Sequence, residues 1–154
     1  MLCIPKANHK KLFEDCYPAA KALAGTAPEY RPNANELGRL CYYAQSKPAK
    51  LIKVGRLLAV RAAAECRAFR AAPSDKTKAL LMITLGILKE LVATCGEGHV
   101  YIAPTVQSVL TEALQVSSSR TFWDADVNAR AAAIFAIYVE SLEPADMEID
   151  ECVS

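Results

Sequence analysis

The chain has 154 residues, of which 53% are hydrophobic and 7% aromatic, with only six glycines. This length suits about one domain with a substantial core, and the abundance of Ala favours helices over strands. No apolar run approaches the roughly 20 residues of a membrane span, and early charges such as Lys6 interrupt any secretory signal. We therefore expect a protein in the cytosol, or one attached to a membrane from the cytosolic side.

The net charge of +1 conceals a division between the two halves of the chain. Residues 1–78 contain 15 Lys and Arg against 6 Asp and Glu, a balance of +9, whereas residues 79–154 contain 3 against 11, a balance of −8. Such asymmetry indicates an anionic partner for the first half. A solvated charged face is the alternative, and composition leaves it open.

The first half is expected to contain three helices. A short helix over 10–16 stops at Pro18, and a linker rich in Pro leads to residue 34. Asn35 can cap a second helix, because its side chain can accept from free amides of the first turn. Pro48 suits the first turn of a third helix, whose apolar residues recur at helical spacing to about residue 70.

Three further helices are expected in the second half. The fourth, over 75–95, is apolar on nearly every side and ends at Gly96, so we expect it to be buried with Leu85 and Leu88 in the core. The fifth runs from about 102 to 115, with Pro104 in its first turn. The sixth runs from about 125 to 142, and either Asp124 or Asp126 can cap it.

Helices of this length joined by short breaks predict an all-α fold of antiparallel helix pairs, of HEAT or armadillo type, at the start of an α-solenoid. A compact bundle remains the alternative, because no crisp internal repeat is visible. The expected organisation is a membrane-proximal segment and linker over 1–34, a helical-repeat domain over 35–142 and a frayed acidic tail over 143–154. If the chain is a fragment, its last helix should expose an apolar surface formed by Ile134, Phe135, Ile137 and Tyr138.

The sequence offers little for catalysis. Its only histidines are His9 and His99, and it lacks a GxSxG elbow, an HExxH zinc motif and a Gly-rich phosphate loop. The six cysteines include no CxxC pair, so most are interpreted as small core residues, with Cys3 as the exception. We expect no catalytic residues, no metal and no cofactor.

The third expected helix, over 46–70, carries seven Lys and Arg but a single acidic residue, Glu65. At 100° per residue its apolar residues fall within one sector, and Leu57 and Val60 fall among the cations on the other side. The candidate lipid-binding residues on this basic face are Lys50, Lys53, Arg56, Arg61, Arg67 and Arg70, and the preceding segment can add Lys6, Lys10 and Lys11.

Two kinds of anionic partner fit this face. Each basic group near an anionic leaflet contributes about 1 kcal/mol, and nucleic acid phosphates would suit the same charges. Cys3 favours the membrane, because an acyl chain beside a basic patch supplies the two signals that stable anchoring needs. Tyr42 and Tyr43 point about 100° apart on a helix and form no common stacking platform, so single-stranded nucleic acid is a minor alternative.

Three segments occur in the order and spacing of a known family: "LCIPKANHKKLFEDCYP", "RPNANELGRLCYYAQSKPAKLIKVGRLL" and "KTKALLMITLGILKELVATC". Together they cover about residues 2–95. No single motif is specific, but their colinear order resembles the N-terminal part of the Eighty-five Requiring family, called Rolling Blackout in animals.

The resemblance implies a non-enzymatic α-solenoid at the cytoplasmic face of the plasma membrane, which binds acidic phospholipids and recruits a phosphatidylinositol 4-kinase through a tetratricopeptide-repeat scaffold. Lys47, Lys50, Lys53 and Arg56 match the family's basic positions. Cys3, the candidate acylation site, matches its near-terminal cysteine, and animal members add palmitate to N-terminal cysteines. Many fungal relatives have consecutive basic residues where this chain has Lys47-Pro48-Ala49, which implies a weaker patch. Family members run to several hundred residues, and their scaffold-binding region lies far downstream. A soluble helical-repeat module that binds protein or RNA is the alternative.

Overall fold

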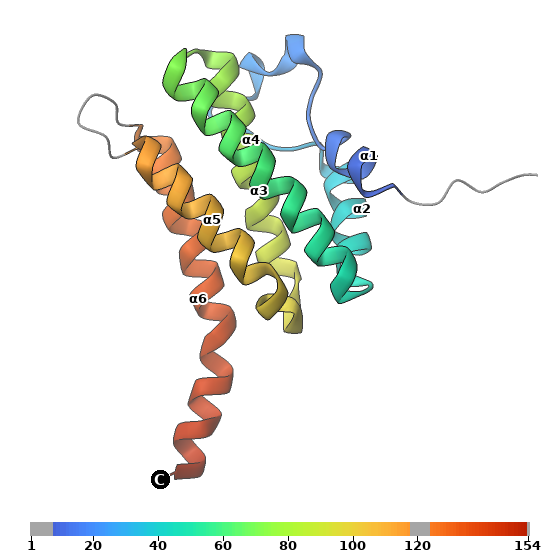
Figure 1. Ribbon diagram of the computed structural model, residues 1–154, viewed down its shortest axis with the longest axis vertical. Coiled ribbons are helices and arrows are strands. Elements are labelled where there is room, and N and C mark those ends of the chain that lie inside the picture. Colours follow the sequence, from blue (N-terminus) through green and yellow to red (C-terminus); the bar gives the residue numbers. More distant parts are fainter. Residues whose placement is uncertain (1–7, 118–123, 154) are drawn as a thin grey trace, which may run out of the picture.

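The computed structural model describes the backbone of residues 8–117 and 124–153 and the side chains of residues 8–115 and 124–142. Within these ranges the chain forms helices and contains no strand, which confirms the all-α prediction (Figure 1). The α-helices are α1 (His9–Glu14), α2 (Ala34–Gln45), α3 (Pro48–Ala71), α4 (Asp75–Thr94), α5 (His99–Ser117) and α6 (Ala125–Val153). Short 3₁₀ turns are η1 (Ala20–Ala22), η2 (Ala24–Thr26) and η3 (Gly96–Gly98).

The start of α2 differs from the prediction. Asn33 is the N-cap, not Asn35, and no side chain caps the helix. The Asn33 amide instead donates hydrogen bonds to the carbonyl oxygens of Asp15 (2.9 Å) and Tyr17 (3.2 Å). This side chain is therefore used to fasten the turn after α1, and the helix begins one residue before Asn35.

Helices α3 and α4 begin and end where local sequence signals place them. Pro48 lies in the first turn of α3, as predicted. Ser74 and Thr77 form a capping box at the start of α4, in which each side chain bonds the other residue's backbone N–H. Gly96 follows α4 with a φ of 55°, the left-handed conformation that Gly adopts without strain.

The last two helices extend further than predicted. Helix α5 begins at His99, because η3 leads straight into it, so Pro104 lies in its second turn instead of its first. Asp124 caps α6 by accepting from the Val127 N–H (3.0 Å). The backbone of α6 remains helical to Val153, so the tail predicted to be frayed continues the helix. Glu, Ala and Met in this stretch are good helix formers.

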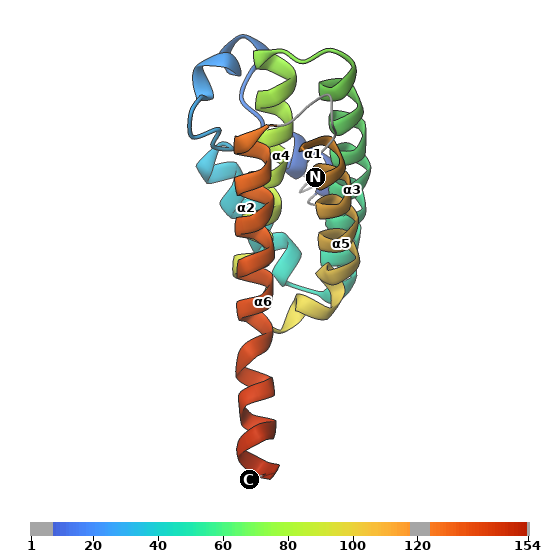
Figure 2. The same ribbon diagram turned by 90° about the vertical axis from the view of Figure 1, so that its left-hand side faces the viewer.

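The helices form two stacked hairpins. Short connections make α3 antiparallel to α4 and α5 antiparallel to α6, while α3 packs against α5 and α4 against α6 (Figure 2). Helices α1 and α2 pack on the first hairpin. Hairpins stacked in this way are the arrangement of a helical-repeat solenoid, as predicted from the helix lengths and breaks.

The segment between α1 and α2 belongs to the same core. Leu23 and Tyr30 are buried in it together with residues of α4. The Arg130 guanidinium, on α6, donates to the backbone carbonyl oxygens of Glu29 (2.6 Å), Tyr30 (3.1 Å) and Met82 (2.9 Å). One side chain thus joins this segment to two distant helices.

An apolar groove of about 510 Å³ lies between α5 and α6. Phe135 and Tyr138 line it, and Phe135 is 58% exposed. Ile134 is fully buried, so its expected exposure was wrong, while Ile137 and Tyr138 are half-buried. The exposed apolar surface predicted for the last helix is therefore present but centred on Phe135.

Gly55 permits the close contact between α3 and α5. A Cβ atom at this position would lie 2.5 Å from the Thr105 hydroxyl oxygen. We expect Gly55→Ala to lower the free energy of unfolding by about 1–2 kcal/mol, since the steric cost outweighs the helix propensity that Ala gains. Urea denaturation of Gly55→Ala and of Gly55→Ala with Thr105→Ala checks this, because the second change removes the obstructing oxygen. Equal losses in both variants would contradict the steric explanation.

Candidate functional site

The outward side of α3 carries a row of exposed residues directly opposite its buried side. They recur every three or four positions, so they share one helix face. We call this set the outer row: Lys53, Arg56, Val60, Ala64 and Arg67. The opposite face packs into the core through Leu51, Leu58, Ala62 and Phe69. Because α3 is fixed by the core on one side, the outer row is held in a fixed array on the other.

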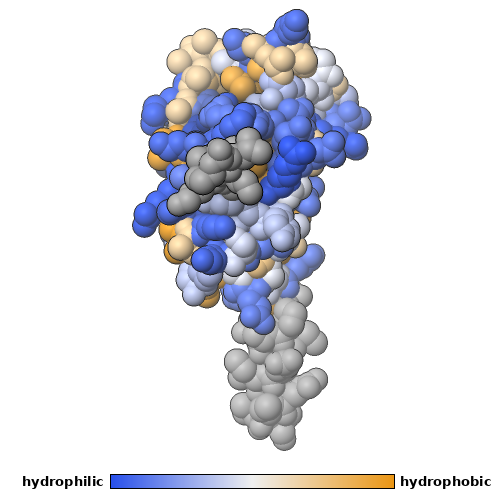
Figure 3. All heavy atoms as spheres, turned by 90° about the vertical axis from the view of Figure 1, so that its right-hand side faces the viewer, coloured by the Kyte–Doolittle hydropathy of each residue, from blue (hydrophilic) through white to orange (hydrophobic). Residues whose placement is uncertain are grey.

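The cations of this face have no anionic partner among the described residues. Lys53, Arg56, Arg67 and, at the last turn of α3, Arg70 are exposed and make no salt bridge with any part of the chain that the structure describes. Figure 3 shows the side of the molecule that carries α1, which is mostly hydrophilic with scattered hydrophobic side chains. These cations thus give the outward face of α3 a positive charge that no described acidic residue pairs with.

Other candidate cations lie at the margins of the outer row. Lys47 is exposed at the N-cap of α3, and the Lys50 ammonium lies over the Tyr43 ring, 4.6 Å from its centroid. Lys10 is exposed on α1, while Lys11 pairs with Asp15 at 3.3 Å. Lys6 and Cys3 lie outside the described residues.

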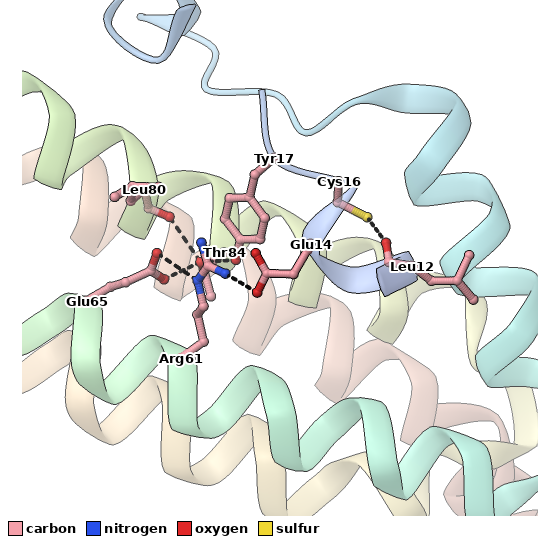
Figure 4. A network of polar contacts seen from close by, with 8 residues as sticks. All are labelled: Leu12, Glu14, Cys16, Tyr17, Arg61, Glu65, Leu80 and Thr84. Atoms are coloured by element: carbon pink, nitrogen blue, oxygen red, sulfur yellow. Dashed lines mark hydrogen bonds and ion pairs between the residues drawn. The ribbon is translucent and has the colours of Figure 1, made fainter. Parts of the chain in front are cut away.

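Arg61 does not face outward with the other cations, which corrects the helical-wheel expectation. Its side chain is only 25% exposed and turns toward α1 and α4 (Figure 4). The guanidinium pairs with Glu14 at 2.6 Å and with Glu65 at 3.3 Å, and it stacks on the Tyr17 ring at 3.9 Å. The pair with Glu65 spans one helical turn, a spacing that favours such contacts. Arg61 is therefore occupied by internal partners.

Glu65 and its neighbours form a closed polar network between three elements. Its carboxylate accepts from the Thr84 hydroxyl on α4, and Thr84 also bonds the Tyr17 hydroxyl at 2.5 Å. Burial raises the pKa of Glu65 from 4.5 to about 7, although the Thr84 hydrogen bond and Arg61 oppose this shift. A buried acid with a raised pKa can mark a catalytic site. Here each polar group is bonded to another protein group, so we interpret the network as the fastening that holds the segment after α1 to α3 and α4.

Glu65→Gln should change how stability depends on pH. Because the pKa of Glu65 is higher in the folded chain, the stability that its proton provides is complete below about pH 4.5 and is lost as the pH rises through 7. Between pH 5 and pH 8 the free energy of unfolding of the variant should therefore rise relative to that of the parent, by on the order of 3 kcal/mol. Urea denaturation across this range measures the difference. Tyr17→Phe is the control, since it loses a network contact but keeps the titrating acid; parallel curves for Glu65→Gln and the parent would contradict the assignment.

The cysteines behave as core residues where the structure describes them. Cys16, Cys41 and Cys66 are buried, as predicted, and burial raises the pKa of the Cys16 and Cys66 thiols to about 12. In the described ranges no three His, Cys, Asp or Glu residues are arranged to hold a metal ion. Among these residues no single helix has the length and apolar composition of a membrane span; only α4 and α5 taken together, bent by 117°, do.

The two adjacent tyrosines, Tyr42 and Tyr43, point in different directions, as expected. Tyr42 is 80% exposed, whereas Tyr43 is half-buried and packs against the core. They offer no joint platform on which bases could stack.

The internal role of Arg61 was missed by sequence reasoning, although one signal for it existed. Glu65 is the only acid in the basic stretch, and it lies four residues after Arg61. That spacing pairs an Arg with an acid on one helix face. Nothing local indicated Tyr17 and Thr84 as partners. Tyr17 lies 44 positions before Arg61, and Thr84 lies 19 positions after Glu65.

Stacked helix hairpins, with a cationic face that forms no salt bridge within the described residues, define an all-α helical-repeat protein with a charged surface. The sequence model described as "EFR3 protein" matches residues 8–131, and this chain belongs to the EFR3 family. The match spans α1 to the first part of α6 and includes the whole outer row. It confirms the resemblance found from the colinear segments.

Curated relatives support the same assignment. Protein EFR3 of Mycosarcoma maydis is 52% identical over 155 residues, covering 97% of this chain and 15% of the relative. Protein EFR3 of Cryptococcus neoformans var. neoformans serotype D is 36% identical over 140 residues, covering 90% of this chain and 14% of the relative. The chain thus spans about one seventh of these relatives. No solved structure matches it.

Proposed function

We propose that this chain is the membrane-contacting part of a non-enzymatic peripheral adaptor at the cytoplasmic face of the plasma membrane. In this proposal the outer row of α3 binds acidic phospholipids. The longer protein of this family would in turn recruit a phosphatidylinositol 4-kinase through a tetratricopeptide-repeat scaffold, as the resemblance implies. Family membership supports the adaptor role in general, and the lipid contact and the kinase complex are the finer parts of the proposal.

The observation that carries the proposal is a set of exposed cations on one rigid helix that form no salt bridge within the described residues. Lys53, Arg56 and Arg67 face the same direction because the opposite side of α3 is buried. Each can contribute about 1 kcal/mol near an anionic leaflet, and Lys10, Lys47 and Arg70 lie exposed nearby. Contributions of this size add to a moderate affinity that weakens as salt screens the surface potential.

Vesicle co-sedimentation of the chain tests the lipid contact. We expect binding to vesicles that contain phosphatidylserine or phosphoinositides, little binding to pure phosphatidylcholine, and a steep loss between about 0.1 M and 0.5 M salt. A single-stranded RNA arm distinguishes the alternative of a soluble module. Binding to RNA together with equal recovery on neutral and acidic vesicles would overturn the membrane proposal.

A further inference from the structure

The outer row contains an apolar centre between its cations. Val60 is 72% exposed, although it is β-branched and sits on a helix with a well-packed opposite face. Ala64, one turn further on, is also exposed, and Leu57 is half-buried beside them. These three residues line an open groove of about 580 Å³ between α1 and α3, together with Lys10, Phe13 and the ion pair of Glu14 and Arg61.

Cations stand on both sides of this apolar centre along the helix. Lys53 and Arg56 lie one to two turns before Val60, and Arg67 lies two turns after it, all exposed and without a salt bridge in the described chain. Long basic side chains can reach polar headgroups while the backbone between them lies deeper. An apolar centre flanked by such cations suits a membrane interface, although the main apolar sector of α3 packs into the core.

We propose that Leu57, Val60 and Ala64 enter the boundary between headgroups and acyl chains of an anionic bilayer when the outer-row cations contact its headgroups. This inference rests on the proposed membrane function and deepens it, because it adds an insertion step to an otherwise electrostatic contact. The groove between α1 and α3 would then receive the first part of a lipid acyl chain.

The exposed apolar centre of the outer row favours a bilayer over other anionic partners. RNA phosphates would match the cations equally well, but they provide no apolar phase for Val60 and its neighbours. Glu14, the acid that lines the groove, does not oppose an anionic surface strongly, since it pairs with Arg61. A bilayer alone offers negative charge directly above an apolar layer.

A fluorescence experiment tests insertion directly. Trp123 is the only Trp of the chain, so a Trp123→Phe background isolates the signal of Val60→Trp. With acidic vesicles we expect a blue-shifted emission for the residue-60 probe and quenching by lipids brominated near the top of the acyl chain. Phe135→Trp is the matched control, since residue 135 is an exposed apolar position on α6, outside the outer row, and its emission should change little. Co-sedimentation with an unchanged residue-60 emission would overturn the inference.

Affinity for acidic vesicles provides a second readout. It includes a variant that should bind more tightly, a result that misfolding cannot produce. Val60→Ser should weaken binding to acidic vesicles about fivefold, while Ala64→Leu should strengthen it about threefold to tenfold because it adds inserted apolar area. Phe135→Ser should bind like the parent. If the parent binds acidic vesicles but Val60→Ser and Ala64→Leu bind equally well, the insertion is wrong and the electrostatic contact stands. If the parent binds no acidic vesicles, the proposed function itself fails.

Discussion

Leu88→Ala is expected to lower the free energy of unfolding by about 2–5 kcal/mol. Leu88 is fully buried on α4, the helix that contacts α2, α3 and α6 and has buried residues on most sides. Truncation removes apolar contacts and leaves a cavity that neighbours fixed in two hairpins cannot readily fill. A loss of this size is a large fraction of the stability of a typical domain, so the variant should also melt at a clearly lower temperature.

Urea denaturation, followed by the helical circular dichroism signal, measures this loss. Val100→Ala on α5 is the matched control, because Val100 is 63% exposed and its truncation should change stability by less than about 0.5 kcal/mol. A loss for Leu88→Ala as small as that of the control would place this residue on the surface and contradict the helix pairing.

Local signals were sufficient to predict the central helices. Pro48 and Gly96 bound α3 and α4 where the sequence places them, because each acts through its own backbone geometry. The nearly uniform apolarity of α4 predicted burial on most sides, and Leu85 and Leu88 are indeed fully buried. Features that depend on one residue or one helix turn could therefore be predicted.

Features that depend on residues distant in the sequence could not be predicted. The segment before α2 reads as a linker because of its prolines, yet Arg130, about 100 positions away, binds the carbonyl oxygens of Glu29 and Tyr30. Likewise the Asn33 side chain donates a hydrogen bond to the carbonyl oxygen of Asp15 in the turn after α1, and it does not cap α2. A hydrogen bond across the fold leaves no periodic trace in the sequence, so both roles were missed.

The candidate surface was predicted in part, for the same physical reason. The helical wheel separates the buried side of α3 from Lys53, Arg56 and Arg67, because that separation follows from the period of the helix alone. It does not show which flanking cation turns inward. Arg61 lies on the flank beside α1, where Glu14 and the Tyr17 ring bind it. The structure thus places Arg61 in an internal network, apart from the cations of the outer row.

Reversing the outer-row charges should abolish binding to acidic vesicles while leaving the fold intact. In the variant Lys53→Glu, Arg56→Glu, Arg67→Glu, each change removes an attraction of about 1 kcal/mol and adds a repulsion of similar size. Even after a discount for orientation and salt, we expect the affinity to fall by at least about 100-fold. All three side chains are exposed and without a salt bridge in the described chain, so helicity and melting temperature should change little.

A control with the same change in net charge separates a local contact from a general charge effect. Lys21, Arg31 and Lys89 are exposed on η1, the α2 lead-in and α4, away from the outer row, and their triple reversal to Glu also subtracts six charges. Because the leaflet potential falls off within about a Debye length, roughly 8–10 Å, charges on another face should contribute much less. Co-sedimentation and circular dichroism of both variants measure the effect. If the two triple reversals weaken vesicle binding equally, or if the outer-row variant binds like the parent at physiological salt, α3 is a solvated face and the membrane contact lies elsewhere.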